Sequence, residues 1–224
     1  MRTAAKKERD FPVHEMLAAG MILATVGGFL DAYSYLLKGG VFANAETGNL
    51  VLMGMRLATG EWWGALQALC PVLAFFAGVL VTELLKARLP ANLFLGWQHV
   101  VLLVESLLLF FVGLFPSSFP SESAVVIIAF ICSMQVNAFR KTRGLPYATT
   151  MCTGNLRSAA ECAHRAFFLK DRQAARDMGR YLLIIGMFLA GAALGAWFCG
   201  IFAERAVWFC CAALLALFFL LLRD

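Results

Sequence analysis

Long apolar runs alternate with short polar stretches along the 224 residues of the chain. An α-helix needs roughly 20 apolar residues to cross the hydrocarbon core of a bilayer. Runs of about this length lie at 16–37, 62–86, 96–115, 122–139, 175–199 and 206–222. They are continuous, unlike the alternating apolar and polar residues of a membrane β-strand. The pattern predicts an all-α integral membrane protein with six transmembrane helices.

Two further segments differ from these spans. Segment 47–59 is apolar but would reach only about 20 Å as a helix, and segment 153–169 carries several charged residues. Both open with Thr-Gly-Asn-Leu, at 47–50 and at 153–156. Each also follows glycine or proline, which allow a chain to turn back. We therefore expect two re-entrant half-helices.

An offset of 106 residues relates the two motifs and predicts an internal duplication. The same offset moves the first three spans onto apolar segments of the second half, at 122–143, 168–192 and 202–221. It also pairs Asp31 with Asn137. We expect repeat 1 at 16–115, an outer linker at 116–121 and repeat 2 at 122–224.

The distribution of positive charge predicts the topology. If the two motif segments crossed the membrane fully, the loop with Arg140, Lys141 and Arg143 would lie outside, against the positive-inside rule. If each segment enters and leaves on one side, 16 of the 19 Lys and Arg lie inside, including those of segment 1–15. Three spans per repeat then give a 3+3 inverted repeat, as in many transporters. Both termini are predicted to be cytoplasmic.

Composition supports a membrane location and excludes several other classes. Hydrophobic residues make up 61% and charged residues 15%, with a mean hydropathy of +0.77, whereas soluble domains are nearer 45–50% and 25%. The net charge of +5 is attributed to loops beside anionic lipid, not to nucleic-acid binding. Motifs for ATP binding and common hydrolases are absent from the sequence, so we predict neither an enzyme nor a cofactor. The seven cysteines are read as small hydrophobes, and no metal site is predicted.

The two half-helix starts are the predicted binding site. Thr47 and Thr153 are expected to be N-caps, the following glycines to allow close approach, and the asparagines to offer amides at mid-depth. Helix starts there would direct positive dipole ends to the protein centre. The alternative is that the motif only closes and packs the helix start. The predicted binding residues are Thr47, Gly48, Asn49, Asn137, Thr153, Gly154 and Asn155.

Two intramembrane carboxyls are proton-coupling candidates, because an ionisable group in a span is costly. Asp31 lies in the first span and Glu105 near the middle of the third. For each, a structural hydrogen bond or ion pair is the alternative. Gly191 and Gly195 form a G-x-x-x-G pattern that permits close helix packing within the chain or in a homodimer.

Several stretches resemble the YoaK-like family of uncharacterised bacterial inner-membrane proteins. The resemblance covers nearly the whole chain and implies a membrane location but no substrate. The chain departs from the family pattern at Ala45-Glu46, where the family commonly has Asn-Met. The stretches that carry the resemblance are Gly28-Phe29-Leu30-Asp31-Ala32, Gly40-Val41-Phe42, Thr47-Gly48-Asn49-Leu50, Met134-Gln135, Asn137-Ala138, Thr149-Thr150 and Thr153-Gly154.

From the residues themselves we predict a transporter or channel-like protein for a small polar or anionic solute, surrounded by membrane lipid. The alternative is a non-transporting membrane scaffold or a lipid-binding or lipid-modifying protein. A polar cavity that reaches the T-G-N segments would favour transport, whereas a dry, packed centre would favour a scaffold.

Overall fold

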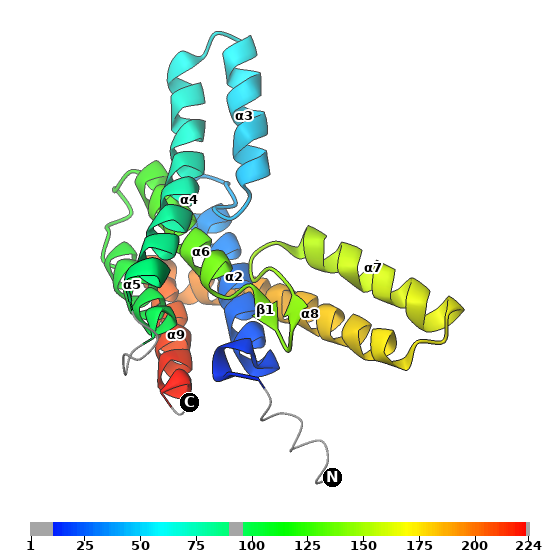
Figure 1. Cartoon of the computed structure of the whole chain (residues 1–224). Coiled ribbons are helices and arrows are strands. Elements are labelled where there is room, and N and C mark those ends of the chain that lie inside the picture. The colour runs from blue at the N-terminus through cyan, green and yellow to red at the C-terminus, as the bar shows by residue number, and fades with distance from the viewer. Residues whose placement is uncertain (1–10, 90–95, 223–224) are drawn as a thin grey trace.

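The computed structural model describes residues 11–89 and 96–222, and each predicted apolar segment is helical in it (Figure 1). Most of the predicted N-terminal segment 1–15 therefore lies outside the described residues. The α-helices are α2 (Leu17–Leu37), α3 (Glu46–Ala58), α4 (Trp62–Arg88), α5 (Trp97–Val112), α6 (Ser121–Ala138), α7 (Cys152–Phe168), α8 (Arg172–Phe202) and α9 (Trp208–Leu221). The 3-10 helices are η1 (Val13–Glu15) and η2 (Ala203–Val207).

A small β-hairpin was not expected from the sequence. Strands β1 (Lys141–Thr142) and β2 (Leu145–Pro146) pair antiparallel, with Lys141 opposite Pro146. Their turn contains Gly144 at φ 76°, a backbone conformation that glycine adopts readily. The hairpin begins shortly after α6 and precedes the loop that leads into α7.

Length and apolar composition identify a membrane protein. Four helical stretches in the described residues are long and apolar enough to cross a membrane, and α5 is a shorter apolar helix of 16 residues. The four stretches are 17–37, 62–88, 121–138 and 172–221, the last of which contains α8, η2 and α9. Many large apolar side chains on α4 and α8 are exposed, including Phe76 and Leu189, as expected for helices that face lipid.

Helices α2 and α6 form the centre of the molecule. Helix α8 packs along α2, α4 packs along α6, and α5 packs against α9. Two hairpins, α3 with α4 and α7 with α8, extend from this centre in different directions (Figure 1). The main hydrophobic core lies between α2, α5, α6 and α9.

The G-x-x-x-G pattern joins α8 to α2, which is the within-chain packing that the sequence left open beside a homodimer. A Cβ atom added to Gly191 would lie 2.0 Å from the carbonyl oxygen of Thr25, and one added to Gly195 would lie 2.9 Å from that of Phe29. The absence of these side chains lets the two backbones touch. Because residue numbers rise together along the contact, α2 and α8 run parallel.

The directions of the other two helix pairs follow from similar contacts. Helices α4 and α6 run parallel, whereas α5 and α9 run antiparallel. The contacts that establish these directions are Gly78–Phe130 and Glu83–Asn137 for the first pair, and His99–Phe218 and Phe110–Trp208 for the second.

Gly191→Ala is expected to destabilise the protein by about 1–3 kcal/mol, because the added methyl group must displace the α2 backbone. Gly186→Ala on the same helix is the matched control, since a Cβ there meets no atom within 4 Å. The control is expected to be neutral or slightly stabilising because alanine favours a helix. Unfolding of both variants in detergent micelles measures the difference, and equal stability would contradict the close packing.

An ion pair ties the end of α2 to η2. The Lys38 ammonium lies 2.6 Å from Glu204, and the Tyr33 hydroxyl donates a 2.8 Å hydrogen bond to the same carboxylate. Lys38 is only 2% exposed. Lys38, one of the three cations that the charge pattern of the sequence predicts outside, is therefore buried and neutralised.

Candidate functional site

The loops that lead into α3 and α7 both reach the same turn of α2. In the first loop, the Asn44 amide donates to the Gly27 carbonyl oxygen at 3.2 Å, and the Asn44 backbone N–H donates to Asp31 Oδ1 at 3.2 Å. In the second loop, Thr149 and Thr150 pack on Gly27, where an added Cβ would lie 2.8 Å from the Thr149 carbonyl oxygen. Glycine at this position therefore permits the close approach.

These residues, together with Glu46, form what we call the central polar cluster: Gly27, Asp31, Asn44, Glu46, Thr149 and Thr150. Figure 1 shows α3 and α7 beginning near the central helices and running outward along α4 and α8. The cluster therefore stands where two helix starts approach one turn of α2.

The predicted threonine N-caps are wrong. The N-cap residues are Ala45 and Met151, and neither forms a side-chain capping bond. Thr47 and Thr153 lie inside the first turns and are exposed. The reason is tertiary: contacts with α2 hold the entry loops, so helical geometry begins two residues after Asn44 and after Thr150. A helix start leaves up to four N–H groups unpaired, and at both starts the N-cap side chain forms no capping bond.

The two asparagines of the motif are buried but make different bonds. The Asn155 side chain forms two hydrogen bonds with the backbone of Ala148, donating at 2.7 Å and accepting at 3.1 Å. Asn49 instead donates to Glu46 Oε2 at 3.1 Å. Asn155 therefore fixes the loop before α7, whereas Asn49 orients a carboxylate of the central polar cluster.

Three other predicted residues lie apart from these bonds. Gly48 and Gly154 are exposed, and a Cβ at Gly154 would meet no atom within 4 Å. Asn137 donates to Glu83 at 3.0 Å and accepts a short hydrogen bond from Arg140. These bonds place Asn137 in a polar group at the C-terminal end of α6.

Four buried polar atoms of the central polar cluster have no hydrogen-bond partner among the described residues. They are Asn44 Oδ1, Glu46 Oε1, Thr149 Oγ1 and Thr150 Oγ1. A buried polar atom left without a partner costs about 1–3 kcal/mol, so this group favours water or a polar solute beside it.

The sequence prediction did not include Asn44 or Thr150 among the binding residues. A signal for them exists, because the 106-residue offset that relates the two T-G-N motifs also relates these two positions. Asn44 precedes α3 by two residues and Thr150 precedes α7 by two residues, and both contact Gly27.

Glu105 is fully buried on α5, and neither carboxyl oxygen has a hydrogen-bond partner within the described part of the chain. Of the two predicted carboxyls, only Asp31 belongs to the central polar cluster.

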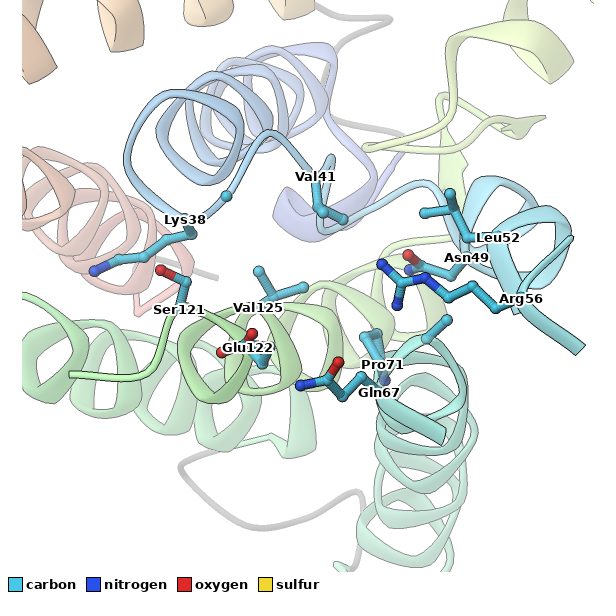
Figure 2. A pocket seen from close by; sticks show the side chains of 12 residues that line it. Lys38, Val41, Asn49, Leu52, Arg56, Gln67, Pro71, Ser121, Glu122 and Val125 are labelled. Carbon is cyan, nitrogen blue, oxygen red and sulfur yellow. The ribbon is translucent and has the colours of Figure 1, made fainter. Parts of the chain in front are cut away.

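A cavity of about 150 Å³ extends from the C-terminal end of α2 and the N-terminal end of α6 to Asn49 (Figure 2). We call it the outer cavity, because Lys38, Arg56 and Ser121 belong to segments that the sequence predicts to lie outside. Its walls come from α3, α4, α6 and the segment after α2. Its polar lining residues are Lys38, Asn49, Arg56, Gln67, Ser121 and Glu122.

Comparison with known proteins establishes the family. The family model described as a protein of unknown function, DUF1275, matches residues 19–220. The chain belongs to the DUF1275 family. The match covers both T-G-N segments, so the DUF1275 region contains the central polar cluster and the outer cavity.

A curated relative of this DUF1275 chain supports its membrane character. The chain is 25% identical over 180 residues to the UPF0700 transmembrane protein YoaK of Bacillus subtilis (strain 168). The alignment covers 78% of this chain and 80% of the relative. The resemblance to the YoaK-like family is thereby confirmed. No solved structure matches the chain.

Proposed function

We propose that the protein is a transporter or channel-like protein for a small polar or anionic solute. The observation that carries this proposal is the approach of two uncapped helix starts to one turn of α2, beside four buried polar atoms without partners. Irregular backbone at membrane depth persists where it is buried in protein or lines a wet cavity. Broken helices of this kind form the solute sites of many transporters.

An inverted repeat is part of the proposal, and the packing of the helices supports it. The proposed repeat relates α2 to α6, α3 to α7, α4 to α8 and α5 to α9. Under this relation, the packing of α2 against α8 corresponds to the packing of α6 against α4. The packing of α3 against α4 corresponds to the packing of α7 against α8. The counterparts α5 and α9 pack antiparallel, which is the relation expected between inverted repeats.

Two re-entrant segments are also proposed. Helix α2 ends at Leu37, yet Asn44 bonds back to Gly27, about 15 Å nearer the start of the helix. The second entry loop, after α6, reaches the same turn at Thr149. With six crossing helices and 16 of 19 cations inside, both termini are cytoplasmic and the membrane is the inner one.

Cysteine labelling is expected to place the two entry loops on opposite sides of the membrane. Phe42→Cys should react with an impermeant reagent from outside, and Lys141→Cys only from the cytoplasm; both native side chains are exposed. The background should replace Cys70, Cys152 and Cys162, the native cysteines that are not buried. Labelling of both loops from one side would reject the inverted repeat.

The charges of the site limit the solute that we propose. Two helix starts favour negative charge or a carbonyl oxygen, but Asp31 and Glu46 add two carboxyls beside them. A neutral polar solute satisfies both sets, and an anion fits when a carboxyl is protonated. Proton coupling through Asp31 or Glu105 therefore belongs to the proposal.

Thr150→Val is expected to lower solute flux about two- to tenfold, since one neutral hydrogen bond contributes about 0.5–1.5 kcal/mol. Thr142→Val is the matched control, because Thr142 is also buried with an unpartnered hydroxyl but lies in β1. Both variants should fold as stably as the parent. The measurement is the light-scattering response of proteoliposomes to gradients of urea, glycerol, acetate and β-alanine.

The outcomes separate the functions. Flux above that of empty vesicles for at least one probe, reduced by Thr150→Val alone, supports a solute path through the central polar cluster. Equal flux in both variants would remove this path. Absence of flux from the parent protein for every probe would favour the scaffold or lipid-binding alternative.

A further inference from the structure

The outer cavity contains two opposite charges that form no ion pair with any described residue. Its third ionised side chain, Lys38, is already paired with Glu204 at 2.6 Å. The Arg56 guanidinium donates to the Gly64 carbonyl oxygen at 2.6 Å, but among residues 11–89 and 96–222 no carboxylate lies within ion-pair distance of it. Glu122 likewise has no ion pair with any described cation.

These two charges come from different walls. Arg56 projects from α3 and Glu122 from α6, with Gln67 of α4 between them in the view of Figure 2. Pro71 and Val125 add an apolar surface to the same cavity. The cavity thus offers a cation and an anion on different walls, together with a polar amide and apolar side chains.

We propose that the outer cavity binds a small zwitterion, with its carboxylate on Arg56 and its ammonium on Glu122. The proposal rests on the transport function above and names the class of its solute. The planar guanidinium still has donors available and suits a carboxylate, which it can bind through two parallel N–H groups. The short aliphatic part of the solute lies against Pro71 and Val125.

Charge complementarity explains why a zwitterion is preferred over a singly charged solute. A solute with a carboxylate but no amine can pair with Arg56, but its negative charge is repelled by Glu122. A solute with an amine but no carboxylate can pair with Glu122, but its positive charge is repelled by Arg56. Such juxtaposition of like charges is a common source of specificity in binding sites. Asn49 also lines the cavity, so a bound zwitterion would lie beside the first turn of α3.

The test uses the full-length protein in detergent and probes matched in length. Glycine, β-alanine, 4-aminobutyrate and 5-aminopentanoate sample the separation between the two charges. For each, the corresponding carboxylic acid and alkylamine carry one charge alone. Isothermal titration should give a Kd for one zwitterion at least about tenfold below those of its two singly charged analogues, since a charge-assisted hydrogen bond supports a difference of this size.

Variants assign the charges to the two side chains. Arg56→Gln and Glu122→Gln should each raise the zwitterion Kd at least about tenfold, while Arg56→Lys, which keeps the charge but loses the fork, should raise it less. Arg157→Gln is the matched control, because Arg157 is exposed on α7 and pairs with Glu161 at 2.9 Å. Thermal unfolding of each variant verifies that the fold is intact.

The outcomes distinguish this inference from the function on which it rests. Equal binding of a carboxylate or an amine, or no effect of either Gln variant, would overturn the zwitterion site, even if urea or acetate crosses proteoliposomes. Zwitterion binding that depends on Arg56 and Glu122, without flux of any probe, would support the site and overturn transport.

Discussion

Asp31→Asn is expected to abolish solute uptake driven by a pH gradient while leaving the fold intact. Asn has the same shape, and its amide oxygen can still accept the hydrogen bond from the Asn44 backbone N–H, which is 3.2 Å from Asp31 Oδ1 in the native protein. An amide cannot bind and release a proton at physiological pH. The variant therefore separates the structural role of Asp31 from proton coupling.

The measurement is uptake into proteoliposomes with and without an imposed pH gradient, with counterflow at equal pH as the second readout. Counterflow should survive Asp31→Asn, because the solute site is kept. Glu61→Gln is a suitable control, since Glu61 is an exposed carboxyl in the turn between α3 and α4. Uptake in Asp31→Asn that still follows the gradient would show that Asp31 is not the proton carrier.

Glu105→Gln completes this experiment. Glu105 lies in the core with no hydrogen-bond partner among the described residues, so a neutral amide is tolerated there at least as well as a charged carboxylate. Loss of gradient-driven uptake in Glu105→Gln alone would assign coupling to α5. Unchanged uptake in both variants would make both carboxyls structural.

Asn155→Ala is expected to lower the free energy of unfolding by about 2–3 kcal/mol, whereas Asn49→Ala should lower it by about 1 kcal/mol or less. The first change removes both hydrogen bonds to Ala148 and leaves its backbone N–H and C=O groups without those partners. The second removes a single bond to Glu46. Of the two asparagines in the repeated T-G-N motif, Asn155 in the second half is therefore expected to be the mainly structural one.

Denaturant unfolding in micelles measures this difference, and titration with β-alanine measures binding. Asn49→Ala should weaken binding more than it weakens folding, because Asn49 lines the outer cavity. Asn155→Asp, which keeps the acceptor but loses the donor, should fall between the parent and Asn155→Ala in stability. Equal loss of stability in the two alanine variants would show that the motif serves the same role in both halves.

The sequence alone determined the helices and their environment. Apolar runs longer than those of a soluble domain have few alternatives to a membrane, because exposed hydrocarbon is unfavourable in water. The expected segment 47–59 is helix α3 at Glu46–Ala58, and 153–169 is α7 at Cys152–Phe168. The sequence also predicted that Gly191 and Gly195 permit close helix packing, because small residues four apart lie on one helix face, but it left open whether the partner lies within the chain or in a second copy.

The tertiary structure decided which polar groups meet. Asn44 and Thr150 are 106 residues apart in sequence, and only the folded chain brings both to Gly27. The N-caps are Ala45 and Met151 instead of the predicted threonines, because contacts of the entry loops with α2 set where each helix begins.

For the charged residues too, the sequence predicts one property and the tertiary structure decides another. A count of cations along the chain predicts which loops face the cytoplasm, because that rule depends on composition and position alone. It does not say that Lys38 is neutralised by Glu204 while Arg56 and Glu122 face one cavity without ion pairs to other described residues. Ion pairing acts over a few ångströms, so partners far apart in sequence are set by the packing of helices, not by the local pattern of residues.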